Sequence, residues 1–221
     1  MKIASQILIT LIVLIIFSCR DPSKNAQKKS KTDINDCINK YDPILSSIQY
    51  YYRIWLEDEN KTYYNNVDLI DPQKIKNLSY IDDNIEHLIN SIDTVKSYLK
   101  DLAYVGAEYG KNLKFAIKDN NVQIDFQSKW REYQESLTKV MAYDIERINR
   151  FMNIFIFLRD NQSNFEVKND MIYFLNDATL HEFNKLTDML SDKKLNANQE
   201  QTRITTLNLF LDALSLAKEN S

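Results

Sequence analysis

The hydrophobic residues of this chain recur at helical spacing over most of its length. Between residues 85 and 116, apolar or small side chains alternate steps of three and four without a break, as on one face of a long helix. They are Ile85, Leu88, Ile92, Val95, Leu99, Leu102, Gly106, Tyr109, Leu113 and Ala116. A second seam follows a polar turn near residues 119–121, and its members are Phe126, Trp130, Tyr133, Leu137, Met141, Ile145, Ile148, Met152 and Phe155. Two long seams joined by a short turn predict two antiparallel helices packed on each other.

Shorter helical patterns flank this pair on both sides. Asp42-Pro43 and Asp71-Pro72 each favour a helix start, since Asp caps the first turn and Pro fits the first helical position. The helix after Pro43 is expected to carry an apolar face, made of Ile44, Leu45, Ile48, Tyr52, Trp55 and Leu56. A loop over residues 60–66 follows. Two further helices are predicted near the end, with the apolar sets Leu180, Phe183, Leu186 and Leu190, then Ile204, Leu207, Leu211 and Leu214.

The stretch after Arg159 breaks the helical pattern. Two short runs, 164–167 and 171–174, flank the polar turn Lys168-Asn169-Asp170, which is typical of a small β-hairpin. Asn176 or Asp177 is expected to cap the helix that follows. The chain has two glycines and three prolines, too few for the frequent turns of an all-β protein. The sequence therefore predicts an all-α class: a bundle of four or five helices, built on two long antiparallel ones, with one small β-hairpin near residues 164–174.

The first eighteen residues have the pattern of a secretory signal. Lys2 precedes an apolar run over residues 7–17, which is shorter than the roughly 20 residues of a permanent membrane-spanning helix. The run ends in Ile16-Phe17-Ser18-Cys19, which resembles a lipobox: an aliphatic residue, then a small residue directly before cysteine. We expect cleavage between Ser18 and Cys19 and acylation of the Cys19 thiol, so that lipid holds the protein at a membrane. The alternative is an ordinary signal peptide with a chance cysteine.

Three segments follow from this pattern. Residues 1–18 are the signal peptide, residues 19–32 are the acylated cysteine with a polar, lysine-rich tether, and residues 33–221 are the helical domain. Arg20 stands where aspartate would favour retention at the inner membrane. In a host with two membranes we therefore expect the outer membrane, with the domain facing the periplasm. Exposure on the cell surface is the alternative.

Charge is balanced along the chain, with 28 basic and 31 acidic residues and a formal net charge of −3. Proteins that bind nucleic acid normally present a clearly basic face, so no nucleic acid partner is expected. The expected partners are a membrane, through the N-terminal lipid, and an unidentified protein of the cell envelope.

One part of the chain resembles a known family. Cys37-Ile38-Asn39-Lys40, followed by an aromatic-rich helix that reaches Trp55-Leu56, is similar to the start of a group of bacterial lipoproteins, domain of unknown function 3829. The likeness continues loosely through residues 98–110 and covers residues 33–190. It implies a secreted, lipid-anchored, mostly helical domain without an established activity, catalytic residue or cofactor. Some members carry a second downstream cysteine that can pair with the first, and its absence here argues against a structural disulfide.

Residue types that carry catalysis or bind metals are sparse. Cys37 is the one thiol besides Cys19, and its apolar neighbours favour a buried residue over a bridge between two chains. Asp83 and His87 stand four apart on a predicted helix and could share a metal ion, although exposed carboxylates are more often solvated. The sequence contains no motif of a serine nucleophile, a phosphate-binding loop or a cysteine pair for metal. It therefore predicts no catalytic residue, no metal site and no cofactor.

Gly106 and Gly110 are the only glycines, and they lie four residues apart in the first long helix. Each costs about 1 kcal/mol relative to alanine inside a helix, so a structural reason is expected. Close packing against a bulky ring such as Trp130 is one reason, and a hinge in the helix is the other.

Aromatic residues are densest around the first helix and the loop after it. Tyr52 and Trp55 fit its core face, whereas Tyr50, Tyr63 and Tyr64 are expected to be exposed, as aromatic residues at binding surfaces are. We therefore predict a non-enzymatic envelope lipoprotein that binds or scaffolds another protein, with Tyr50, Tyr63 and Tyr64 as candidate contacts. One alternative is a surface-exposed lipoprotein that acts on a host or competitor cell, and a more distant one is a metal-binding enzyme.

Overall fold

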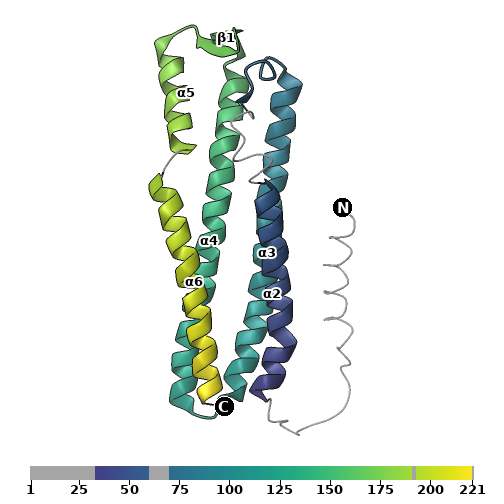
Figure 1. Ribbon diagram of the computed structural model, residues 1–221, viewed down its shortest axis with the longest axis vertical. Helices are drawn as coiled ribbons and strands as arrows, with labels where there is room; N and C mark the ends of the chain where they lie inside the picture. The colour runs from purple at the N-terminus through teal and green to yellow at the C-terminus, as the bar shows by residue number, and fades with distance from the viewer. Residues whose placement is uncertain (1–32, 60–69, 191–192, 221) are drawn as a thin grey trace. The chain divides into compact units, whose positions relative to one another are not determined.

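The computed structural model describes residues 33–59, 70–190 and 193–220, with the backbone alone for residues 193–196. The chain divides after Lys31 into two units, and every described residue belongs to the second unit, Thr32–Ser221. Its described residues form α2 (Ile34–Glu59), α3 (Leu78–Ala116), α4 (Asn120–Asp160), η3 (Gln162–Asn164), β1 (Phe165–Lys168), β2 (Met171–Phe174), α5 (Asp177–Leu190) and α6 (Lys193–Glu219). The predicted all-α class, a helical bundle with one small hairpin, is confirmed (Figure 1).

The two long helices, α3 and α4, run antiparallel as the seams predict (Figure 1). Asp119 begins α4, because its side chain accepts hydrogen bonds from the backbone N–H groups of Asn121, at 2.7 Å, and of Val122, at 3.2 Å. Most members of both seams are buried, and Leu99, Leu137, Ile145 and Met152 are half-buried. The unbroken spacing of three and four therefore identified the faces on which these helices pack.

Gly110 lies where the Trp130 side chain of α4 packs directly on the α3 backbone. A Cβ atom at this position would stand 2.1 Å from Nε1 of Trp130, which is far inside van der Waals contact. The same Nε1–H donates to the backbone carbonyl of Gly106, at 3.0 Å, so the indole is fixed against the helix. Close packing against Trp130 is therefore the reason for Gly110, and α3 continues as one helix through both glycines. The hinge alternative stays a prediction.

The helix start predicted at Asp42-Pro43 is wrong, because α2 begins at Ile34 and runs through Pro43. Ile34, Cys37 and Leu45 are all buried and share one face of this helix. Burial of that face over both halves of the helix offsets the hydrogen bond that Pro43 cannot donate. Cys37 is buried and free, as its apolar neighbours predicted.

The start predicted at Asp71-Pro72 is also wrong, since α3 begins only at Leu78. Asp71 does cap a turn: its side chain accepts from the N–H of Gln73 at 2.8 Å, and its carbonyl accepts from the N–H of Ile75 at 3.1 Å. This turn ends before Asn77. The side chain of Asn77 accepts from the N–H of Ser79 at 3.0 Å and caps α3. The predicted loop at residues 60–66 lies outside the described residues.

The hairpin forms where the sequence predicts it. β1 and β2 pair antiparallel with Lys168 opposite Met171, and Asn169 and Asp170 form the turn with φ of 50° and 58°. Two successive positive φ values define the turn that matches the twist of a two-residue hairpin, and Asn and Asp tolerate them best after glycine. Asn176, rather than Asp177, then caps α5 by accepting from the N–H of Thr179 at 2.8 Å.

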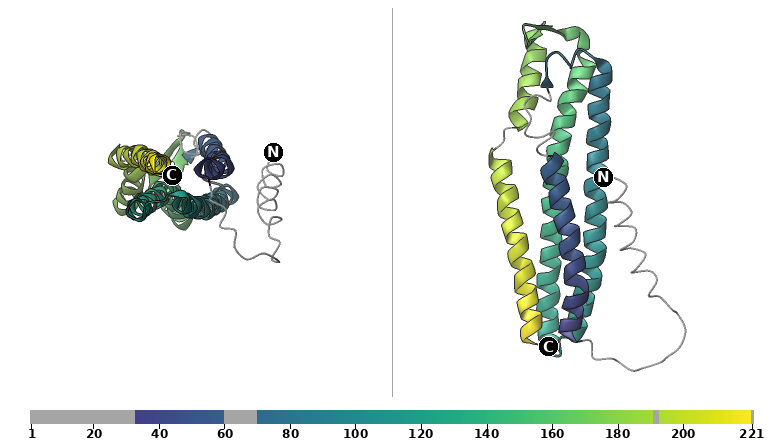
Figure 2. Two further views of the ribbon diagram at one scale, coloured as in Figure 1. Left: turned by 90° about the horizontal axis from the view of Figure 1, so that it is seen from below. Right: turned by 45° about the vertical axis from the view of Figure 1, so that its right-hand side comes forward.

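The last helix, α6, packs on α4 through a face other than the predicted one. Ile204, Leu207 and Leu211 are 48%, 58% and 52% exposed, and of the predicted set only Leu214 is buried. The face that α6 turns toward the bundle carries Gln199, Thr206, Ala213 and Ala217 instead. Figure 2 shows α6 beside α4 on one side of the bundle, and α2 beside α3 on the other.

Polar groups buried on α4 explain this orientation. Asp144 accepts from Nε2 of Gln199 at 2.5 Å, and the hydroxyls of Ser136 and Thr206 share a hydrogen bond at 2.7 Å. Burying a polar group without a partner costs about 1–3 kcal/mol, so α6 is held in the orientation that satisfies both residues of α4. Phe210 completes the contact, with its ring centroid 5.2 Å from that of Tyr133.

Candidate functional site

The exposed aromatic surface predicted from the sequence is described only in part. Tyr50 is half-exposed on α2, its ring makes an edge contact with Tyr51 at a centroid distance of 5.6 Å, and the Arg53 guanidinium lies 5.8 Å from its centroid. These contacts place a small aromatic and cationic surface on α2. The other residues predicted for binding, cleavage or acylation lie outside the described residues: Tyr63, Tyr64, Ser18 and Cys19.

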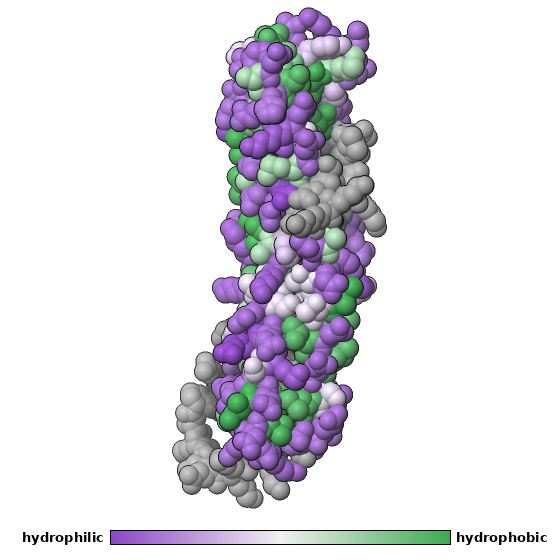
Figure 3. Space-filling model, turned by 90° about the vertical axis from the view of Figure 1, so that its left-hand side faces the viewer, coloured by the Kyte–Doolittle hydropathy of each residue, from purple (hydrophilic) through white to green (hydrophobic). Residues whose placement is uncertain are grey.

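A second exposed surface lies on the outward side of α6, and we call Ile204, Leu207 and Leu211 the α6 stripe. Their spacing of three and four residues places them on one side of the helix, next to the buried Leu214 at the edge of the packed face. Figure 3, which views the α5 and α6 side, shows hydrophobic patches among polar atoms in its lower half, at the level of α6. The sequence identified these residues as an apolar face but placed that face in the core.

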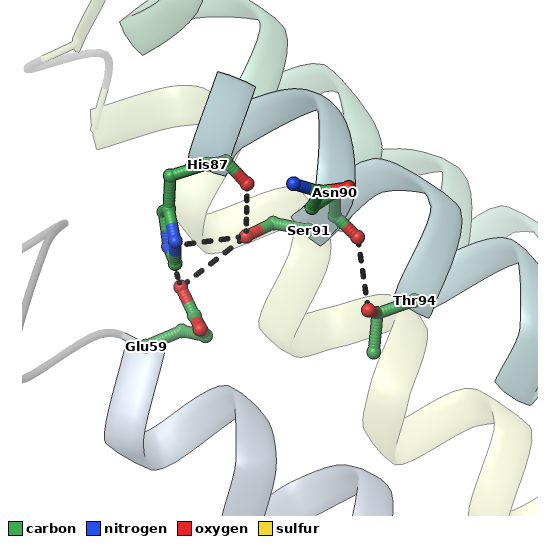
Figure 4. Close-up of polar contacts among 5 residues, drawn as sticks. All are labelled: Glu59, His87, Asn90, Ser91 and Thr94. Carbon is green, nitrogen blue, oxygen red and sulfur yellow. Dashed lines mark hydrogen bonds and ion pairs between the residues drawn. The ribbon is translucent and has the colours of Figure 1, made fainter. Parts of the chain in front are cut away.

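His87 lies in a polar cluster that joins the end of α2 to α3 (Figure 4). Its Nε2 atom is 2.9 Å from Oε2 of Glu59, and Oγ of Ser91 lies 3.3 Å from the same Nε2. Ser91 is buried and donates to the carbonyl of His87, at 3.1 Å, or to Glu59, at 3.4 Å. The cluster therefore links the end of α2 to α3 through hydrogen bonds between polar side chains.

This cluster contains the residue types of a nucleophilic triad but not its geometry. In a triad the serine and the acid contact opposite nitrogens of the histidine ring, so that the acid orients the ring while the other nitrogen takes the proton of the serine. Here Glu59 and Ser91 both face Nε2, so this acid and this serine do not occupy those two positions. The sequence missed Glu59, because it stands 28 positions before His87 and outside any helical repeat.

The sequence offered Asp83 and His87 as a possible metal pair and favoured a solvated carboxylate instead. Asp83 is exposed, and the His87 ring lies against Glu59 and Ser91. Within residues 33–59, 70–190 and 193–220, no group of three or more His, Cys, Asp or Glu side chains is placed to hold a metal ion.

Asp144 forms the buried polar centre of the bundle. The Tyr52 hydroxyl donates to Oδ2 at 2.5 Å, Gln199 donates to Oδ1, and the guanidinium of Arg203 lies 3.2 Å from Oδ1. One carboxylate on α4 thereby binds α2 on one side and α6 on the other. Burial raises the pKa of Asp144, although the hydrogen bond from Tyr52 and the charge of Arg203 act in the opposite direction.

Tyr109 buries a hydroxyl that has no hydrogen-bond partner in the described part of the chain. Its ring stacks on Tyr41 at a centroid distance of 5.5 Å and meets Trp130 edge-on at 5.4 Å, so packing holds it in place. Burial raises the pKa of the hydroxyl well above its usual range, and the nearby Asp42 adds to the effect. Burial also raises the pKa of the Cys37 thiol, which makes this cysteine a poor nucleophile.

No protein-family model, curated protein or solved structure matches this chain. The resemblance to the lipoprotein family therefore stays a prediction. None of the described helices combines the length and the apolar composition needed to cross a membrane.

Proposed function

We propose that this chain is a lipid-anchored protein of the bacterial envelope and that its helical body binds a partner protein through the α6 stripe. One observation carries the proposal: Ile204, Leu207 and Leu211 of α6 are about half-exposed along one line, outside the face that packs on the bundle. Three aliphatic side chains aligned in this way form an exposed apolar patch, which is typical of an interaction surface.

The occupant that fits this face is a helix of the partner protein. Steps of three and four residues are the spacing at which side chains of one helix insert between those of another. Arg203 and Asp212 flank the stripe, and each pairs with a residue of α4: Arg203 with Asp144 at 3.2 Å and Asp212 with Lys129 at 3.9 Å. Their side chains are also partly exposed, so they can contribute to the polar rim that protein interfaces carry. The role proposed is therefore binding rather than catalysis.

Photo-crosslinking in living cells tests this proposal at the level of single residues. A photoreactive amino acid replaces Leu207 or Leu211, and we expect each to give the same discrete protein adduct. Thr205, which is exposed but points away from the stripe, is the matched control on the same helix, and Ile89 is an exposed aliphatic control on α3. Equal labelling from Thr205 and Leu207, or no adduct from the stripe, would contradict the proposal.

The place of the protein in the envelope is part of the same proposal. The residues that resemble a lipobox before Cys19, together with Arg20, support an outer-membrane anchor, and we propose that the body faces the periplasm. Protease treatment of intact cells separates the two orientations: a periplasmic body survives, whereas a body on the cell surface is cut. Cleavage would favour the alternative in which the protein acts on a host or competitor cell.

A further inference from the structure

Two large hydrophobic side chains project from the end of the bundle where α3 turns into α4. Phe115 is the next-to-last residue of α3 and is 66% exposed, and Ile124, in the first turns of α4, is 64% exposed. These are the largest exposed fractions among the large hydrophobic residues that the structure describes. The turn between them packs on the last helix, because the N–H of Lys118 donates to the carbonyl of Asn220 at 3.3 Å. We call Phe115 and Ile124 the apolar tip.

The chain enters the helical body at this same end. Tyr41 of α2 stacks on Tyr109 of α3, and the two helices are antiparallel. Ile34 lies seven residues before Tyr41, and Ala116 lies seven residues after Tyr109, so the start of α2 is level with the end of α3. Figure 1 shows both at the bottom of the bundle, next to the end of α6.

The segment that precedes α2 determines what can reach the apolar tip. Residues 20–32 separate Cys19 from the body, and their polar sequence leads us to expect a tether with a root-mean-square reach of about 20 Å. Four lysines, at positions 24, 28, 29 and 31, stand directly before α2 and favour an anionic lipid surface. A lipid on Cys19 would therefore hold this end of the bundle, rather than the hairpin end, next to the bilayer.

We infer that the apolar tip inserts into the lipid headgroup region, so that the body stands on the membrane with α3 and α4 pointing away from it. This inference rests on the proposed lipid anchor and deepens it by naming a second contact with the same bilayer. One lipid-linked residue allows the body to tumble, whereas two apolar side chains at the tip fix which end faces the membrane.

Charge at the tip decides the kind of contact. Three lysines stand against five acids at this end of the bundle: Lys114, Lys118 and Lys218 against Asp33, Asp36, Asp119, Asp125 and Glu219. The tip therefore has no excess of positive charge to attract anionic lipid, and its contact with lipid comes from apolar burial. We therefore expect the depth of Phe115 and Ile124 to be insensitive to salt, in contrast to any contact made by the lysines of the tether.

Spin labelling of the full, acylated chain in vesicles of phosphatidylethanolamine and phosphatidylglycerol tests the inference. The variants are Phe115→Cys, Ile124→Cys and, at the opposite end of the bundle, Leu175→Cys, which replaces a side chain that is 59% exposed. Cys37 is buried with a raised pKa, so it should react slowly, and the chain without an added cysteine controls for it. Accessibility to oxygen, which concentrates in lipid, is compared with accessibility to a water-soluble nickel chelate.

We expect the ratio of oxygen to nickel accessibility to be several-fold higher at positions 115 and 124 than at position 175, and unchanged at high salt. If the protein stays bound to the vesicles but all three positions are equally accessible to nickel, the inference is overturned and the anchor stands. If the protein does not bind the vesicles at all, the anchor and the inference both fail.

Discussion

At the scale of single residues, Gly110 has the least freedom to change. In Gly110→Ala the new methyl group would overlap the Trp130 ring and displace the indole from its hydrogen bond to Gly106. We expect a loss of about 2–4 kcal/mol in the free energy of unfolding, measured by urea denaturation. Gly106→Ala is the matched control, because its Cβ would lie an ordinary 3.5 Å from Gln134. This control should gain up to about 1 kcal/mol from helix propensity, and equal effects at both glycines would refute the packing argument.

Two buried tyrosines should respond in opposite ways to loss of the hydroxyl. Tyr109→Phe removes an oxygen without a partner in the described chain, so we expect no loss of stability and a gain of up to about 1 kcal/mol. Tyr52→Phe removes the donor to Asp144 and should cost about 1–3 kcal/mol. Thermal unfolding of the two variants checks this contrast, and destabilisation by Tyr109→Phe would reveal a partner for its hydroxyl.

The pKa of Asp144 makes a prediction about pH. Because burial raises this pKa in the folded state, the native protein binds a proton in a pH range where the unfolded chain has lost it. Stability contributed by this group is therefore greatest at low pH and falls as the pH rises through the native pKa. Compared with Asp144→Asn, the wild-type protein should gain stability as the pH is lowered from 7 toward the unfolded pKa of about 4, measured by urea denaturation at each pH. If the wild-type protein instead loses stability relative to Asp144→Asn as the pH falls, the groups that donate to Asp144 lower its pKa by more than burial raises it.

At the scale of the elements, the orientation of α6 can be tested with one pair of substitutions. Phe210→Ala removes the ring that packs on Trp130 and Tyr133 and should cost about 2–4 kcal/mol. Leu207→Ala changes an exposed side chain of the α6 stripe and should alter stability by less than about 0.5 kcal/mol. Chemical denaturation of both variants gives the answer. A larger loss of stability from Leu207→Ala than from Phe210→Ala would mean that α6 packs through the face that the sequence predicts.

The two long helices could be predicted because their seams are unbroken and each seam needs a partner of similar length. The hairpin could be predicted because Asn169 and Asp170 tolerate the positive φ values of its turn. Predictions of helix starts from single residues were less accurate. Pro43 does not begin a helix, because burial along α2 outweighs the one hydrogen bond that proline cannot donate.

The missed features depend on residues far apart in the sequence. The orientation of α6 is determined by Asp144 and Ser136, which belong to another helix and leave no trace in the spacing of leucines. Glu59 meets His87 only after α2 and α3 have packed. The binding surface that we propose consists of residues that the sequence did identify as apolar, but the sequence alone could not show which of two apolar faces stays exposed.

At the scale of the whole molecule, the proposed membrane anchor depends on one sulfur atom. Cys19→Ser removes the thiol that we propose accepts lipid, so the protein should leave the membrane fraction or accumulate with its proposed signal segment uncut. Fractionation of cells followed by mass measurement of the N-terminus checks this. Mature protein that still sediments with membranes would contradict the anchor and would direct attention to the apolar tip alone.

The hydrogen bonds of Asp144 also constrain the order in which the chain can fold. Its donors come from residue 52, in the first described helix, and from residues 199 and 203, in the last. Because a ribosome makes the chain from its N-terminus, this network cannot be complete until the final helix has been synthesised. The carboxylate is therefore fully paired only when the whole helical domain is available to fold.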